Sequence, residues 1–475
     1  MLYINGEWIT TNEQFNVTNP SNGEIIDTVS KSSERETYKA VKAAKESIKE
    51  WSHKTAKKRY DYLNRVATIL KERIDKIAEV ITKEMGKPLQ ESKGEVSLAI
   101  DYLEWYAEEG RRIYGETIPA SSESKRLIVQ KQPIGVIGAI TPWNFPIAMI
   151  TRKIAPALAA GCTVILKPAS ATPLTAVEVF KAFHDAGIPK GVVNLLHGSA
   201  GGITQILMES PDVRKITFTG STEVGKQLMR QSAETMKKIS MELGGHAPFL
   251  VFQDADLEKS TDGAITSKFR NAGQTCVCVN RMYVHEDIID KFSSLLAKKI
   301  QNLKVGDGYE NQVEIGPLID HQAVEKAFKH VEDAKSKGAD VIAGGRKLTD
   351  GKYRNGFFFE PTLLKNATEE MKIFYEETFG PVAPIFSFKT EEEAIEKAND
   401  TPYGLASYMY TKDGSRMIRV SEALDYGIVG INDPLPTVAQ APFGGVKESG
   451  LGREGGRQGI EDFLEEKFIS IQLED

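Results

Sequence analysis

Between residues 135 and 235 the chain alternates short apolar runs with stretches of helical spacing, and this rhythm limits the possible folds more than any other sequence feature. The apolar runs are 135–140, 163–166, 192–196 and 215–218. The stretches that follow the last three are 174–187, 201–209 and 221–235. Short, mostly apolar runs are typical of strands buried on both faces, and strands joined by helices pair in parallel. The sequence therefore predicts a doubly wound parallel α/β sheet.

Other segments complete the domain plan. Residues 35–115 have helical spacing and are interpreted as scaffold. A second α/β alternation follows residue 244, and the alternating segments 125–132 and 467–473 are expected to pair, within one chain or between two. We expect one domain from 1–120 and 139–243, a second from 244–445, and a strand element from 121–138 and 458–475.

Composition excludes several classes of protein. The chain has 475 residues, 27% of them charged, with a net charge of -6, so it lacks the basic surface that nucleic acid or an anionic membrane would need. Its longest apolar run, 154–166, is too short for a membrane span. Three cysteines make no disulfide framework, and the N-terminus does not resemble a signal peptide. We expect a soluble cytoplasmic protein.

The segment from Arg270 to Arg281 places Cys276 and Cys278 between two guanidinium groups. Neighbouring positive charge lowers the pKa of a thiol and favours the nucleophilic thiolate. Cys276 is therefore a candidate nucleophile. The alternative is that it is a small buried apolar residue.

Two turns after predicted strands indicate a nucleotide site. Lys167 to Ser170 places a cation and a hydroxyl at one strand end, and Phe218 to Gly225 contains a Gly-Ser turn that opens a helix. Ligands bind at such strand ends, where helix N-termini attract phosphate. Each turn alone could be an ordinary connection. Glu242, just before a glycine pair, is either a functional carboxylate or a solvated one.

Other motifs point away from common chemistries. The pattern Gly450 to Gly455 matches a dinucleotide fingerprint, but no apolar strand leads into it, so we do not expect a phosphate loop. The histidines are scattered singly, and Cys-x-Cys without a second ligand pair is a poor metal site. No metal is predicted.

Seven motifs occur in an order that closely resembles the aldehyde dehydrogenase superfamily over nearly the whole chain. They are Thr141–Pro146, Lys167–Ala169, Phe218–Ser221, Met241–Gly245, Gly273–Cys276, Glu376–Pro381 and Pro442–Gly445. Segments 150–153 and 269–278 are most similar to its succinate-semialdehyde dehydrogenase branch. The resemblance implies a nucleotide-binding domain (1–120 and 139–243), a catalytic domain (244–445) and oligomerisation strands, hence a homodimer or homotetramer.

The resemblance also implies roles for residues. Cys276 attacks the aldehyde, Asn144 and the Cys276 amide hold the oxyanion, and Glu242 activates water, with Lys153 and Glu454 relaying protons. The positions matching cofactor contacts are Thr141, Trp143, Asn144, Lys167, Ser170, Gly220, Ser221, Gly225, Glu377 and Phe379. Many NAD-preferring relatives have Glu where Ser170 stands, so we expect NADP to be tolerated or preferred over NAD.

Arg152 and Arg270 match carboxylate-binding arginines, which predicts succinate semialdehyde as the substrate. Relatives often carry a serine where Thr437 and Val438 align, so glutarate semialdehyde stays open. A cysteine hydrolase or a silent binding protein are alternatives from other classes. Cys278 is interpreted as the partner of Cys276 in a reversible disulfide, or alternatively as a packing residue.

Overall fold

The apolar runs of the first half form the centre of an eight-stranded sheet in the computed structural model, which describes residues 1–474. The strands, in spatial order, are β2 (Glu7–Ile9), β1 (Leu2–Ile4), β9 (Val193–Leu195), β8 (Thr163–Lys167), β7 (Val136–Ile140), β10 (Val213–Thr219), β11 (Lys238–Glu242) and β21 (Gly450–Leu451). The strands β9, β8, β7, β10 and β11 are parallel, and β1, β2 and β21 pair antiparallel at the edges. The predicted parallel sheet is confirmed.

Helices cover both faces of this sheet. They are α1 (Glu34–His53), α2 (Ala56–Glu72), α3 (Ile74–Met85), α4 (Leu89–Glu109), α5 (Pro146–Ala160), α6 (Pro173–Asp185), α7 (Ala200–Glu209) and α8 (Thr222–Ser232). Along β7, Ile137 and Ala139 belong to the apolar core on one face, and Val136 and Ile140 belong to the core on the other. This alternation of buried side chains is the reason that the strand is apolar throughout.

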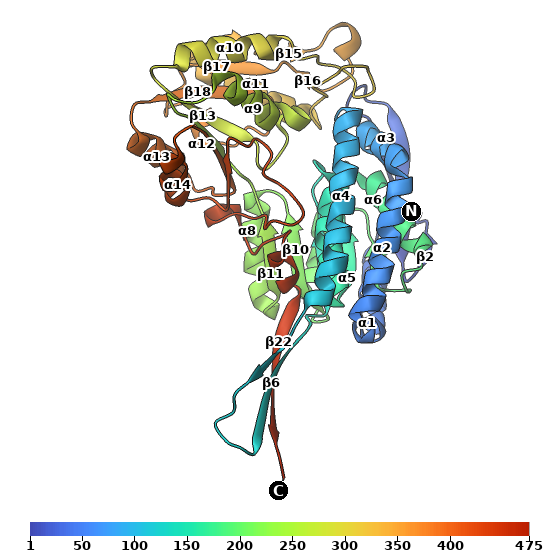
Figure 1. Ribbon diagram of the computed structural model, residues 1–475. Coiled ribbons are helices and arrows are strands. Elements are labelled where there is room, and N and C mark those ends of the chain that lie inside the picture. The colour runs from blue at the N-terminus through green and yellow to red at the C-terminus, as the bar shows by residue number, and fades with distance from the viewer. Residues whose placement is uncertain (475) are drawn as a thin grey trace.

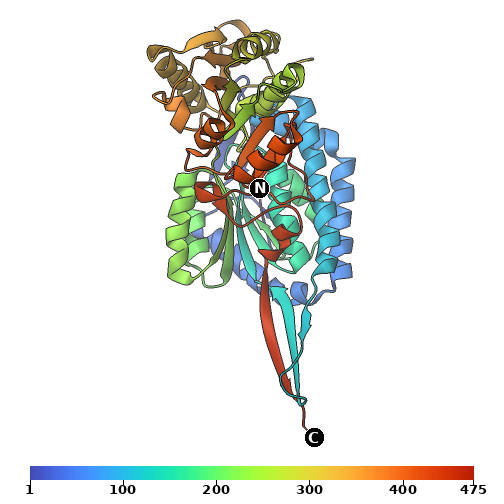
Figure 2. The ribbon, with the colours of Figure 1, turned by 60° about the vertical axis from the view of Figure 1, so that its left-hand side comes forward.

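A seven-stranded sheet forms the upper lobe, coloured yellow to orange (Figures 1 and 2). Its order is β14 (Asp340–Ala343), β17 (Thr362–Lys365), β18 (Val382–Phe388), β13 (Val279–His285), β12 (Ala247–Val251), β19 (Ala406–Tyr410) and β20 (Ile428–Ile431). Its helices are α9 (Leu257–Phe269), α10 (Ile289–Gln301), α11 (His321–Ser336), α12 (Lys372–Tyr375), α13 (Glu391–Asn399) and α14 (Gly414–Ala423). All pairs except β14 with β17 are parallel, which confirms the second α/β unit.

An arm extends away from both lobes (Figures 1 and 2). It consists of β5 (Glu116–Ile118), β6 (Lys125–Pro133) and β22 (Leu464–Gln472), and the predicted pairing of 125–132 with 467–473 is confirmed within one chain. Its bounds correct the expected element of 121–138 and 458–475. β7 already belongs to the large sheet from Val136, and α15 (Gln458–Glu461) packs against α5. Residue 475 lies outside the described residues.

The remaining strands form two small hairpins, β3 (Gln14–Thr18) with β4 (Ile25–Ser30) and β15 (Lys347–Leu348) with β16 (Phe358–Phe359). The fingerprint-like segment at Gly450 begins with the edge strand β21, which pairs antiparallel with β11, so it does not form the turn of a β-α-β phosphate loop. Across residues 1–474, no helix is both long and apolar enough to cross a membrane.

Candidate functional site

Two cavities meet at Cys276. One has a volume of about 230 Å³, and its wall includes Tyr102, Arg152, Arg270 and Thr437. The other has a volume of about 490 Å³, and its wall includes Trp143, Asn144, Thr219, Gly220, Ser221, Lys326, Glu377 and Phe379. Cys276 lines both and is half-buried. A thiol in this position can contact two different small molecules at once.

The loop that carries Cys276 is set by glycines. It follows α9 through Asn271 and Ala272, both left-handed, and Gly273 (φ 76°). A Cβ at Gly273 would lie 2.3 Å from the carbonyl oxygen of Gly380, and a Cβ at Gly245 would lie 2.3 Å from that of Cys276. Because these backbones approach so closely, only glycine fits at the two positions, and the cysteine loop is held against the segments of Gly380 and Gly245.

The structure corrects the expected lowering of the Cys276 pKa. Burial raises the pKa of the Cys276 thiol to about 12, and the carboxylates of Glu242 and Glu377 oppose the lowering effect of Arg152 and Arg270. The Arg281 guanidinium is instead held in the upper lobe, where it donates to the carbonyl oxygens of His246 at 3.1 Å and Ala398 at 2.9 Å. Proximity in sequence did not mean proximity in space.

Asn144 is held beside the cysteine loop. Its side-chain Nδ2 donates to the carbonyl oxygen of Gln274 at 3.1 Å, and its own carbonyl oxygen accepts from Lys87 and Asn271. An amide nitrogen has two hydrogens, so one remains to point elsewhere. The side chain lines the second cavity together with Cys276, which is the position an oxyanion donor requires.

Glu242, Lys153 and Glu454 are fully or almost fully buried. Lys153 forms an ion pair with Glu454, and Arg152 Nε lies 2.5 Å from the other oxygen of the same carboxylate. These two cations hold the pKa of Glu454 below its ordinary value. Burial and the neighbouring charge of Glu454 raise the pKa of Glu242 well above its ordinary value.

Arg152 is therefore less free than expected. Its guanidinium also contacts Met149 Sδ at 2.9 Å and lies 4.1 Å from the centre of the Phe443 ring. Arg270 lines the same cavity, and within residues 1–474 it forms no salt bridge. Of the two predicted carboxylate-binding arginines, Arg270 is the one without a salt bridge in the described residues, although its charge acts on Glu91 in the wall of the same cavity.

The second cavity contains most of the predicted cofactor residues. Ser221 caps α8 by accepting from the Val224 amide at 3.4 Å, and the Trp143 and Phe379 rings meet edge to face at 5.6 Å. Glu377 accepts from the Gly245 amide at 3.2 Å, and burial raises its pKa to about 7. Gly225 packs under this cavity, since a Cβ there would lie 2.5 Å from Leu243.

Three predicted cofactor residues lie at strand ends outside the wall of that cavity. The Thr141 amide donates to the carbonyl oxygen of Lys167 at 3.2 Å. The Lys167 side chain is 5% exposed and, in the described part of the chain, has no hydrogen-bond partner, so burial lowers its pKa. Ser170 is exposed and donates weakly to the carbonyl oxygen of Gly198 at 3.5 Å.

Cys278 does not face either cavity. It is fully buried, and its Sγ lies 3.4 Å from Lys268 Nζ. Cys276 and Cys278 are both free thiols in this structure. Burial of Cys278 in the core of the upper lobe agrees with the alternative interpretation of this residue as a packing residue, and its pairing with Cys276 stays a prediction.

Sequence reasoning missed the contribution of α4, which was interpreted as scaffold. Glu91, Glu95 and Tyr102 from this helix line the smaller cavity, and Lys87 precedes it. Lys87, Glu91 and Glu95 are spaced four residues apart, which places them on one face of a helix. These charged residues at helical spacing, beside apolar neighbours, were the sequence signal that could have predicted a polar face of α4 directed into the protein.

No histidine lines either cavity among the described residues, so Cys276 has no histidine partner there. The same residues contain no group of three side chains that could hold a metal ion.

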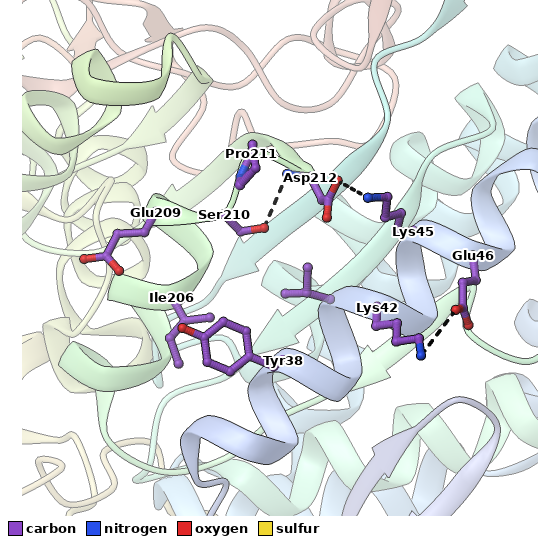
Figure 3. A pocket seen from close by; sticks show the side chains of 10 residues that line it. Tyr38, Lys42, Lys45, Glu46, Ile206, Glu209, Ser210, Pro211 and Asp212 are labelled. Carbon is purple, nitrogen blue, oxygen red and sulfur yellow. Dashed lines mark hydrogen bonds and ion pairs between the residues drawn. The ribbon is translucent and has the colours of Figure 1, made fainter.

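A larger surface depression of about 840 Å³ lies between α1 and α7 (Figure 3). Its Lys45 pairs with Asp212 at 2.7 Å, and its lining residues include no cysteine.

Comparison with known proteins supports the predicted resemblance to aldehyde dehydrogenases. Residues 8–469 match the aldehyde dehydrogenase family. The chain is 53% identical to the succinate-semialdehyde dehydrogenase [NADP(+)] GabD of Escherichia coli and 53% identical to a glutarate-semialdehyde dehydrogenase of Pseudomonas putida, each over 99% of this chain and 97% of the relative. The crystal structure of an E. coli NADP-dependent enzyme superposes with a TM-score of 0.97 at 53% identity, covering 99% of this chain and 98% of the other. The chain therefore belongs to the aldehyde dehydrogenase family.

Proposed function

We propose that the protein oxidises succinate semialdehyde to succinate, with NADP or NAD as the hydride acceptor. The observation that carries the proposal is the position of Cys276 in the walls of two cavities, one lined by Arg270 and one with a helix N-terminus and aromatic side chains. Two relatives with 53% identity are named for semialdehydes that end in a carboxylate. Oxidation of an aldehyde panel with each cofactor tests the proposal.

The residues divide the reaction into two halves. The Cys276 thiol would give its proton to solvent water and bond through sulfur to the aldehyde carbon, and the resulting oxyanion would accept from Asn144 Nδ2 and the Cys276 amide. A bound oxidised nicotinamide would supply the hydride acceptor for this carbon. A thioester on Cys276 remains, and water attacks it as Glu242 takes the proton, releasing the acid and the thiol.

Lys153 and Glu454 would return the Glu242 proton to solvent. Glu454 touches Lys153, and its charge acts on Glu242, so the three buried groups form one electrostatic unit. Such coupled groups titrate together and not as separate acids.

Arg270 would bind the distal carboxylate of the substrate. We expect Arg270→Ala to lower kcat/KM for succinate semialdehyde roughly 10- to 100-fold, because charge-assisted hydrogen bonds are lost, and to leave butanal oxidation nearly unchanged. Initial rates with the two aldehydes measure this, and Arg111→Ala on the exposed surface is the matched control. An equal loss on both aldehydes would reject the carboxylate clamp.

Glutarate semialdehyde is the alternative substrate. It is one methylene longer, and a pocket discriminates one methylene by only about 1–3 kcal/mol. Because Thr437 lines the smaller cavity, the ratio of kcat/KM for the two semialdehydes reports how that side chain fits the shorter tail.

The residues around the second cavity fit a dinucleotide. Thr219 Oγ1, which lines it, is buried and lacks a hydrogen-bond partner within residues 1–474, and the first amides of α8 are capped only by Ser221. Lys167 and Ser221 would hold the adenosine ribose and the pyrophosphate, and Glu377 the nicotinamide-side ribose. The first α/β unit would then be the nucleotide-binding domain and the second the catalytic domain.

Ser170 would allow a 2′-phosphate, since it adds no carboxylate near Lys167. We expect Ser170→Glu to lower kcat/KM for NADP by at least roughly tenfold through charge repulsion, with a smaller change for NAD. Measuring kcat/KM for both cofactors in wild type and variant decides the point. A wild type that strongly prefers NAD would show that this residue does not set the preference.

We also propose that the arm joins subunits into a homodimer or homotetramer. Ile118, Phe468 and Ile471 are 40–61% exposed on its short sheet, which leaves apolar surface and strand edges uncovered. Sedimentation equilibrium measures the number of subunits.

Reversible oxidation of Cys276 through Cys278 stays a proposal, and the burial of Cys278 means that the loop must move for a disulfide to form. We expect peroxide to inactivate wild type in a way that dithiothreitol reverses, and to inactivate Cys278→Ala irreversibly. Recovered activity after each treatment is the measurement. Equal recovery in both proteins would contradict the switch.

A further inference from the structure

A buried ion pair lies behind Asn144. Lys87 and Glu95 are completely enclosed, with 0% and 1% of their side chains exposed, and Lys87 Nζ lies 2.6 Å from Glu95 Oε2. The same ammonium donates to the carbonyl oxygen of Asn144 at 2.7 Å and lies 3.9 Å from the centre of the Phe145 ring. All of its close partners therefore belong either to α4 or to the turn that carries Asn144.

The carboxylate of Glu95 holds a second element in place. Its Oε1 accepts from the amides of Ile147 at 2.9 Å and Ala148 at 3.2 Å, which are in the first turn of α5. The residue at the N-cap of α5, Phe145, provides no side-chain cap. Glu95 thus caps α5 from another helix, and α5 carries Arg152 and Lys153.

The cysteine loop closes the arrangement. Asn271 Nδ2 donates to the same Asn144 carbonyl at 3.0 Å, and the Asn271 amide donates to Glu91 Oε2 at 2.8 Å. Glu91 is one helical turn from Glu95 on α4. The backbone of Asn144 is therefore fixed from one side by Lys87 and from the other by a residue that α4 itself holds.

Burying an ion pair rarely adds stability compared with a neutral pair of similar size. The presence of the Lys87–Glu95 pair is better explained by the groups that it holds in position. On the basis of the proposed function, we propose that Lys87 and Glu95 are positioning residues that set the oxyanion donor Asn144 and the start of α5 against Cys276.

The test separates this role from a purely structural one. Lys87→Met alone would leave a buried carboxylate unpaired, so the variant to use is Lys87→Met with Glu95→Gln, in which the Gln carbonyl oxygen still caps α5. We expect the hydride burst measured by stopped flow to slow roughly 10- to 100-fold while KM for the cofactor changes less than about twofold. Lys93→Met, on the same helix but paired with Asp75 at the surface, should behave as wild type.

The decisive readout is the coupling with Asn144. In an Asn144→Ala background, the two substitutions should slow the burst by less than about twofold further, because the group that they position has gone. An equal slowing in both backgrounds, or no slowing in the wild-type background, would overturn the proposal. A wild type that reduces no cofactor with any aldehyde would instead reject the proposed function, so the two failures are distinguishable.

Discussion

Cys276→Ala is expected to abolish aldehyde oxidation, with a loss of roughly 10⁴-fold or more, because no other side chain can form the covalent intermediate. The formation of reduced nicotinamide at 340 nm measures the effect. Cys162→Ala is the matched control, since Cys162 is a buried thiol that contacts the Phe463 carbonyl oxygen at 3.4 Å, away from both cavities. Turnover that survives in Cys276→Ala would remove the nucleophile from the mechanism.

The raised pKa of Cys276 adds a pH dependence to this result. A thiol with a pKa of about 12 is almost entirely protonated at neutral pH, so alkylation of the cofactor-free protein by iodoacetamide should accelerate about tenfold for each pH unit between 7 and 9. A positive charge beside the thiol lowers its pKa, and oxidised nicotinamide carries one. Oxidised cofactor is therefore expected to speed alkylation at pH 7.

Glu242→Gln is expected to stop the reaction after the first half. The variant should release one equivalent of reduced cofactor in a burst and then turn over roughly 10²- to 10⁴-fold more slowly, because no base activates water against the thioester. Intact-protein mass spectrometry should detect the acyl group on Cys276. If neither the burst nor the acyl-enzyme is seen, Glu242 does not act in deacylation.

The pH dependence of deacylation in the wild type should agree with the role of Glu242 as the base. Burial raises the pKa of Glu242 well above its ordinary value, so the fraction present as carboxylate still grows with pH above the range in which a free glutamate ionises, and deacylation should accelerate with it. The acylation burst in Glu242→Gln should lack this contribution.

The secondary-structure pattern, the sheet class and the order of the motifs could all be predicted from consecutive residues. Strands such as β7 and β8 are apolar throughout because both faces are covered, and that property is written in consecutive residues. The alternation of apolar and polar residues within each arm segment is also a local pattern, and it led to the prediction that the two segments pair. The predicted bounds of the arm, 121–138, overlapped the apolar run 135–140, and β7 belongs to the large sheet from Val136 onward.

The electrostatics of the site could not be predicted from the sequence, because they depend on which charged side chains the fold brings together. The pKa of Cys276 depends on Glu242, Glu377, Arg152 and Arg270, which come from four separate segments, whereas Arg281, five residues away in sequence, points into the upper lobe. Arg152 was predicted as a free cation, but Glu454, about three hundred residues later, lies against it. Charge acts through space, and a chain read in order does not contain those distances.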